Sequence, residues 1–290
     1  MDSHSRAGGG SGTLVPVVIP VHDALPVRRT PWLTYLLIGA NVIIFLLSPA
    51  SRTTGFQQAT VSQLCEQEAF FDRYAAIPTE LVHDQPLPRV ATGQAGVGPN
   101  GPGCVIAAPP YHKRPWLSVL YSMFLHGGWL HLLGNMLFLW VFGNNVEDRL
   151  GRIRFALFYL ACGYAASYAF ALVNANSTDP LVGASGAISG VLGAYLVLWP
   201  RAKVWSLVPF LFFIPIRLPA WIVLGLWFVL QWLYSVGAGV SQAGSVAYLA
   251  HVVGFLLGAL LALPLRGRSR TPPPTRYMRA RWPGPGYDYR

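Results

Sequence analysis

The feature that most constrains how this chain can fold is a series of apolar segments from which acidic residues are almost absent. Between Asp148 and Asp288 the only acidic side chain is Asp179. A bilayer core about 30 Å thick is crossed by about 20 mostly apolar helical residues. Six segments approach this requirement: residues 32–47, 117–142, 155–173, 185–199, 219–234 and 243–265. The sequence therefore predicts an all-α, polytopic membrane protein built as a bundle of six transmembrane helices.

The composition excludes two other classes of protein. Charged residues make up 11% of the chain, whereas a typical soluble domain has about 25%. A water-soluble enzyme of ordinary composition is therefore excluded. The hydrophobic content of 53% is also far too high for a chain that is disordered throughout.

The net charge of +10 could by itself indicate nucleic-acid binding, but the positions of the basic residues favour a different role. With six spans and both termini inside, 16 of the 21 Lys and Arg residues fall in cytoplasmic segments. The two short outer loops, near 174–184 and 235–242, contain none. This asymmetry is the usual topology signal of membrane proteins. We expect the lipid bilayer, and not nucleic acid, as partner, with both termini cytoplasmic in a plasma membrane of bacterial type.

The spans divide the chain into three regions. Residues 1–30 and the basic segment 266–290 are expected to be disordered cytoplasmic tails, and residues 31–265 form the membrane domain with a long extracytoplasmic loop at 51–115. The stretch 204–218 is apolar, but Pro209 and Pro215 disfavour a continuous helix. We expect an interfacial loop there. The alternative, a seventh span, would place the C-terminus outside and break the charge pattern.

Three cysteines are too few for a disulfide framework. Cys162 lies in an apolar segment and is expected to be a packing residue, whereas Cys65 and Cys104 share the long loop. If that loop is extracytoplasmic, these two thiols can form a disulfide. Two free thiols are the alternative.

Strongly polar groups inside a bilayer are costly and by default indicate function. His131 and Asn135 are four residues apart, so they share one helix face. His251 lies on a helix face lined by small residues, and the segment that follows Ser185 has a similar stripe of small residues. Such stripes let helix backbones approach closely, which would bring His251 toward Ser185. The small residues of the two stripes are Gly186, Ser189, Gly190 and Gly193 in one segment, and Gly244, Ala247, Gly254 and Gly258 in the other.

This arrangement predicts nucleophilic catalysis. A serine hydroxyl becomes a good nucleophile when a base within hydrogen-bond distance takes its proton, and His251 is the natural base for Ser185. No acidic residue lies in the spans, so a Ser–His dyad is favoured over a triad. Asn135 and His131 are candidate donors to the developing oxyanion. His251 would lie about 12 Å deep, within reach of water from outside.

Structural readings of the same residues stay open. The small residues can serve packing alone, and a serine in a membrane helix can bond back to a carbonyl oxygen. His131 and Asn135 can form an interhelical hydrogen-bonded pair, and His126 is expected to brace its loop.

Three motifs resemble those of the rhomboid family of intramembrane serine proteases. They are His-Gly-x-x-x-His-x-x-x-Asn at 126–135, Gly-x-Ser-Gly at 183–186 and Ala-His-x-x-Gly-x-x-x-Gly at 250–258, with Val-Glu-Asp at 146–148 also matching. The resemblance covers about residues 31–265. It implies a rhomboid-like six-helix fold, Ser185 as nucleophile, His251 as base, and Asn135 and His131 at the oxyanion. It further implies single-pass membrane proteins as substrates, cut in or near the membrane after a small residue, and no metal or cofactor.

Two positions depart from the family pattern. Leu117-Ser118 stands where many members have Trp-Arg, and Ser189 stands where some have an aromatic residue that stacks on the histidine. The bracing of the loop and of the histidine is therefore open. The alternative function is a catalytically inactive relative that binds membrane clients. A small transporter or channel is disfavoured, because no charged relay crosses the spans.

Overall fold

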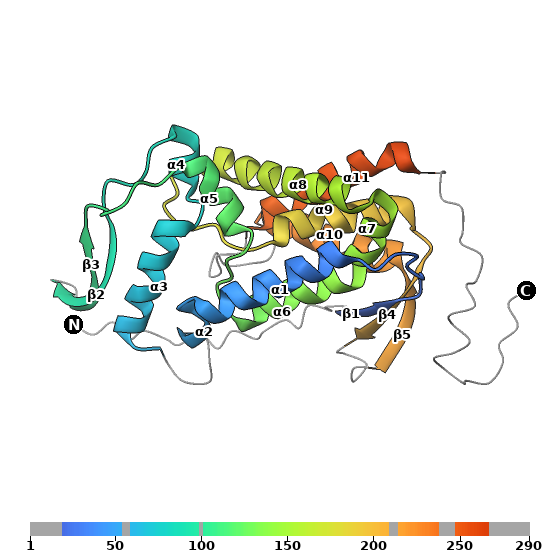
Figure 1. The fold of residues 1–290 in the computed structure, drawn as a ribbon, viewed down its shortest axis with the longest axis horizontal. Helices are drawn as coiled ribbons and strands as arrows, with labels where there is room; N and C mark the ends of the chain where they lie inside the picture. Colours follow the sequence, from blue (N-terminus) through green and yellow to red (C-terminus); the bar gives the residue numbers. More distant parts are fainter. Residues whose placement is uncertain (1–18, 54–58, 99–100, 209–213, 238–246, 267–290) are drawn as a thin grey trace, which may run out of the picture.

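A computed structural model describes residues 19–53, 59–98, 101–208, 214–237 and 247–266 (Figure 1). Five apolar helices coincide with the segments expected near 32–47, 155–173, 185–199, 219–234 and 243–265. They are α1 (Trp32–Leu47), α8 (Arg152–Val173), α9 (Ser185–Leu198), α10 (Ala220–Ser235) and α11 (Tyr248–Ala262), the last extended by the 3-10 turn η3 (Leu263–Leu265). The structure thus has helices where these five segments were predicted.

Two of these helical stretches are long and apolar enough to cross a bilayer, residues 152–173 and 248–265, and α1, α9 and α10 are shorter apolar helices. Their outer faces carry large apolar side chains that no other part of the described chain covers, among them Leu157, Leu172 and Leu260. Large apolar side chains exposed along several apolar helices are typical of a surface that contacts a membrane or a partner. These helices therefore have the exterior expected of a membrane protein.

The segment expected as one span over 117–142 is broken, so this prediction was wrong in its bounds. The structure has α5 (Pro115–Ser122), a turn through His126 and two glycines, and then a continuous helix. That helix consists of α6 (Trp129–Phe138), the π-helical turn η1 (Leu139–Gly143) and α7 (Asn144–Leu150). Two adjacent glycines destabilise a helix, because glycine loses more backbone entropy on ordering than any other residue. The helix therefore begins after Gly128.

The stretch expected as an interfacial loop at 204–218 is a β-hairpin instead. Strands β4 (Lys203–Val208) and β5 (Ile214–Pro219) pair antiparallel, and β1 (Ile19–Asp23) pairs with β4 in the order β1-β4-β5. Alternate residues of β4, namely Val204, Ser206 and Val208, are buried, which is the period of a half-buried strand. Pro215 lies on the edge strand β5, where proline is tolerated, and Pro209 lies outside the described residues.

Part of the tail expected to be disordered is therefore ordered. Residues 1–18 lie outside the described residues, but β1 is held in the sheet and Asp23 is 2% exposed. Its carboxylate accepts hydrogen bonds from the Tyr195 hydroxyl at 2.9 Å and the Asn145 amide at 2.6 Å. Burial raises the pKa of Asp23 to about 7. A polar group buried in this way needs its partners, and they fix the start of the described chain against α9 and α7.

The Glu147-Asp148 pair holds the beginning of α1. The Glu147 carboxylate accepts hydrogen bonds from the backbone N–H groups of Leu33 and Thr34 and from the Thr34 hydroxyl, at 2.7–3.1 Å. Asp148 accepts from the N–H groups of Arg28 and Arg29 at 3.1 Å. A negative charge at a helix N-terminus satisfies orphan N–H groups and complements the helix dipole. The Val-Glu-Asp motif therefore joins α7 to α1.

The described parts of the long loop predicted at 51–115 form an insertion with its own helices and strands. It contains α2 (Ala50–Thr53), α3 (Val61–Tyr74), α4 (Pro78–His83) and the hairpin of β2 (Val90–Gly98) with β3 (Gly101–Ala107). Cys65 on α3 and Cys104 on β3 form a disulfide, so of the two alternatives the structure has the bridge. Cys162 is a free, buried thiol, as expected. In Figure 1 the insertion lies at one end of the helices and the β1-β4-β5 sheet at the other.

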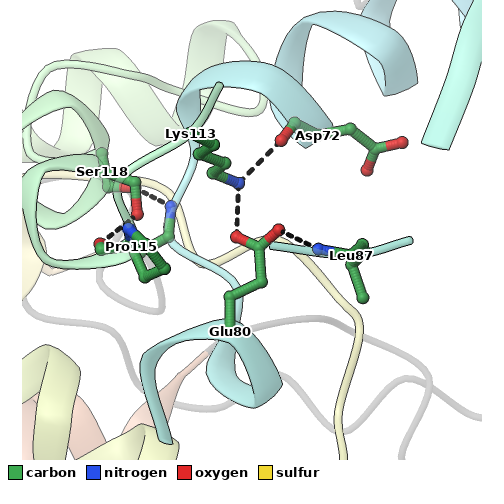
Figure 2. Close-up of polar contacts among 8 residues, drawn as sticks. Asp72, Glu80, Leu87, Lys113, Pro115 and Ser118 are labelled. Atoms are coloured by element: carbon green, nitrogen blue, oxygen red, sulfur yellow. Dashed lines mark hydrogen bonds and ion pairs between the residues drawn. The ribbon is translucent and has the colours of Figure 1, made fainter. Parts of the chain in front are cut away.

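A buried ion pair ties the insertion to the segment that precedes α5 (Figure 2). Lys113 Nζ lies 2.6 Å from a Glu80 carboxylate oxygen, with side chains 4% and 1% exposed. The ammonium also donates to the Asp72 carbonyl at 2.7 Å, and the other Glu80 oxygen accepts from the Leu87 N–H at 2.8 Å. Burial lowers the pKa of Lys113, although the bond to Glu80 opposes this shift. Four segments of the chain therefore meet at this pair.

Replacing Glu80 by Gln is expected to destabilise the insertion by about 3 kcal/mol, because the buried Lys113 ammonium then has no counter-charge. The amide keeps the shape of the side chain and an acceptor for Leu87, so the charge is the main change. Thermal unfolding and limited proteolysis in detergent measure the effect. Glu66→Gln, at an exposed position of α3, is the matched control. Equal stability of the two variants would contradict the prediction.

Candidate active site

Ser185 and His251 lie within hydrogen-bond distance of each other. Ser185 is the first residue of α9, and its Oγ is 2.8 Å from Nε2 of His251 on α11. This is the separation that proton transfer from a hydroxyl to an imidazole requires. The two residues are 66 positions apart in sequence, so helix packing alone brings them together.

The packing of α9 against α11 depends on glycine. A Cβ atom on Gly258 would lie 2.0 Å from the Gly190 carbonyl oxygen, and one on Gly254 would lie 2.1 Å from that of Gly186. A Cβ on Gly193 would similarly lie 2.0 Å from the Phe255 carbonyl oxygen. The helices thus touch backbone to backbone along the two predicted stripes. Gly244, at the start of the second stripe, lies outside the described residues.

Asn135 and His131 project from α6 toward the same place. An ideal Cβ on Gly183 would lie 2.7 Å from His131 Nε2 and 3.6 Å from Asn135 Nδ2. Gly183 has φ of 120°, which an L residue rarely adopts. Glycine therefore lets the loop before Ser185 pass directly against both side chains.

His126 braces Asn135. Its Nε2 accepts a hydrogen bond from the Asn135 amide at 2.9 Å, and its ring meets that of His131 edge to face at 5.1 Å. The His126 side chain is 1% exposed. An amide nitrogen carries two N–H groups, so one of them orients Asn135 while the other is left for a further acceptor.

All four predicted site residues line one cavity of about 740 Å³, whose other lining residues come mainly from α6, α9, α10, α11 and the loop at 180–182. The walls are largely apolar, and the polar groups converge at the end where α9 begins. Such a combination is typical of binding and catalytic sites. The cavity lies inside the apolar helices, where ionisable groups are otherwise scarce.

The loop before Ser185 is anchored by backbone hydrogen bonds to the insertion and to α5. The N–H of Leu181 donates to the Ala76 carbonyl at 2.7 Å, and that of Gly183 donates to the Ser122 carbonyl at 2.9 Å. The Ser122 hydroxyl in turn accepts from the Ala76 N–H at 2.5 Å. The chain that leads into Ser185 is thus held at both ends of this loop by backbone hydrogen bonds.

Three neighbours of His251 were not singled out from the sequence. Gln231 on α10 places its Oε1 2.7 Å from His251 Nδ1. The rings of Trp227 and Tyr248 lie 6.0 and 6.4 Å from the imidazole. Gln231 did give a signal, because it is the only amide or charged side chain within residues 219–234.

Ser189 does not replace the missing aromatic ring. Its hydroxyl donates to the Ser185 carbonyl at 2.6 Å, which is the back-bonding typical of serine in a helix. Trp227 and Tyr248 instead contact the imidazole from other helices. Asp179 lies in the loop, where its backbone N–H donates to the Ser177 hydroxyl at 3.2 Å. The partner of His251 Nδ1 is the Gln231 amide and not this carboxylate. Among the described residues no group of three or more His, Cys, Asp or Glu is placed to hold a metal ion.

Comparisons with known proteins add a second line of evidence. The family model described as Rhomboid domain matches residues 113–268, more than half of the chain. Rhomboid protein 1, mitochondrial, of Saccharomyces cerevisiae is 32% identical over 148 residues, which cover 50% of this chain and 40% of that protein. RHOMBOID-like protein 6, mitochondrial, of Arabidopsis thaliana is 30% identical over 206 residues, 65% of this chain and 60% of that protein.

A bacterial protein is also similar. Rhomboid protease GluP of Bacillus subtilis is 36% identical over 155 residues, 52% of this chain and 27% of that protein. The chain therefore spans less than two thirds of each of these three relatives. The region that the family model matches, residues 113–268, contains all four predicted site residues.

Proposed function

This chain belongs to the rhomboid family of helical integral membrane proteins, and from this premise we propose that it is an intramembrane serine endopeptidase that uses a Ser–His dyad. The family includes proteases such as GluP. The observation that carries the proposal is the 2.8 Å contact between Ser185 Oγ and His251 Nε2 inside a cavity among apolar helices.

The first half of the reaction is acylation. Ser185 Oγ attacks the carbonyl carbon of the scissile peptide bond, and its proton passes to His251 Nε2. The carbonyl oxygen becomes an oxyanion, to which the free Asn135 N–H, His131 and the Ser185 backbone N–H can donate. When the intermediate collapses, His251 gives the proton to the leaving amine, the C–N bond breaks, and an ester to Ser185 remains.

The second half is hydrolysis of this ester. A water molecule entering the cavity gives a proton to His251 Nε2 as its oxygen attacks the ester carbon. Collapse of the second intermediate returns the proton to Ser185 Oγ and releases a carboxylic acid. The reaction therefore needs no metal or cofactor, and the site must exclude bulk lipid while admitting water.

The substrates we propose are single-pass membrane proteins cut in or near the membrane. A site among apolar helices favours a polypeptide that is itself in the bilayer. We propose six spans, formed by α1, the α6–α7 helix, α8, α9, α10 and α11, with both termini cytoplasmic. The arrangement in Figure 1 supports this, because the disulfide-bonded insertion and the β1-β4-β5 sheet lie at opposite ends of the helices.

Labelling with a fluorescent fluorophosphonate tests the function. The purified chain in detergent is expected to take up the label at Ser185, located by peptide mapping, because this reagent reacts with serines that a base activates. Ser185→Ala should remove the label, and Ser167→Ala, at a buried serine of α8, should retain it. A folded wild-type chain that takes no label would overturn the proposal in favour of an inactive, client-binding relative.

A further inference from the structure

We propose that Gln231 is a positioning residue, which holds the imidazole of His251 in the tautomer and orientation that the reaction requires. This inference rests on the proposed function. It starts from the second nitrogen of the imidazole: Nε2 faces Ser185, whereas Nδ1 lies 2.7 Å from Gln231 Oε1. The structure therefore sets His251 between two polar partners on opposite sides of its ring.

The tautomer decides whether His251 can act as a base. A neutral imidazole has one N–H donor and one acceptor nitrogen. An amide oxygen can only accept, so contact with Gln231 Oε1 requires the proton on Nδ1. Nε2 then has the free lone pair that faces the Ser185 hydroxyl. The opposite tautomer would direct an N–H at Ser185 and could not take its proton.

The bond also suits the charged form of the histidine. When Nε2 takes the serine proton, Nδ1 keeps its own, and the bond to Gln231 Oε1 persists through the catalytic cycle. A carboxylate in this place would stabilise the imidazolium more strongly, but it would add an ionised group to an apolar helix. A neutral amide orients the ring without that cost.

The other groups around His251 cannot replace this contact. Trp227 and Tyr248 pack on the imidazole through their rings, which restrict its rotation but leave the tautomer undetermined. His131, from α6, lines the same cavity. Within the described part of the chain, Gln231 is the residue that bonds to Nδ1.

Two variants of Gln231 test the inference. Gln231→Met keeps an unbranched side chain of similar length and removes the acceptor, and it is expected to lower kcat and the fluorophosphonate labelling rate about 10- to 100-fold, as for partners that orient a functional histidine. Gln231→Glu keeps an oxygen acceptor and is expected to restore activity to within about fivefold of wild type. KM for a transmembrane substrate and Tm should change little in either variant.

The readouts separate the outcomes. A residue that only packs would lower Tm in both variants, and a residue that only contacts substrate would raise KM, so either result would overturn the inference. Undiminished kcat and labelling in Gln231→Met, with an active wild type, would overturn it while leaving the proposed function intact. A wild-type chain that takes no label would overturn both.

Discussion

Substituting alanine for Ser185 or for His251 is expected to reduce cleavage of a transmembrane substrate by roughly a thousandfold or more. Without the hydroxyl no acyl-enzyme forms, and without the imidazole the hydroxyl keeps its proton. The measurement is the rate at which a purified model substrate is cut in detergent or liposomes. Both side chains are only partly buried, so the fold and Tm should be retained.

The double variant gives a sharper result than either single one. Because the two residues act as a unit, the Ser185→Ala/His251→Ala chain should be no less active than the single variants. Additive losses would mean that the residues work independently. Substantial cleavage by Ser185→Ala would exclude this residue as the nucleophile.

The largest expected effect on stability is that of Gly258→Val. The new Cβ would have to share space with the Gly190 carbonyl, 2.0 Å away, and backbone on both sides of the contact leaves no rotamer that relieves the clash. We expect a loss of about 3 kcal/mol or more, seen as a lower Tm in detergent. Cleavage should fall as well, since moving α11 from α9 separates His251 from Ser185.

Gly225→Val is the matched control, on the apolar helix α10. No atom from outside its own stretch of helix lies within 4 Å of an ideal Cβ at Gly225, so the new Cβ meets no neighbouring helix. Similar Tm values for the two variants would show that the α9–α11 contact does not govern stability.

The sequence predicted those features that depend on local pattern. Apolar length predicted α1, α8, α9, α10 and α11, and the glycine spacing predicted the close contact that places His251 beside Ser185. Both follow from the period of a single helix. The site residues could be selected because polar side chains are rare in these segments, and the approach of His251 to Ser185 depends on one helix pair, α9 and α11.

Two of the features that escaped prediction, the sheet and the contact of Gln231, depend on distant partners, and the third is a local break that has two readings. The sheet forms because β1, from the start of the chain, pairs with a hairpin about 180 residues later, and proline content obscured its strand pattern. The break before α6 depends on Gly127 and Gly128, which can also occur inside membrane helices. The sequence does not indicate the role of Gln231, because that role depends on its contact with His251 on the neighbouring helix α11.

The bridge between Ala76 and Leu181, in which the Leu181 N–H donates to the Ala76 carbonyl, has a consequence for the engineering of this protein. One residue of the insertion serves as a bridge partner for the chain leading to Ser185. Deleting residues 51–115, or grafting them onto another scaffold, would leave unpaired backbone groups beside the reacting serine. The insertion is therefore not a separable module. A chimaera should therefore exchange the insertion together with the chain near residue 181.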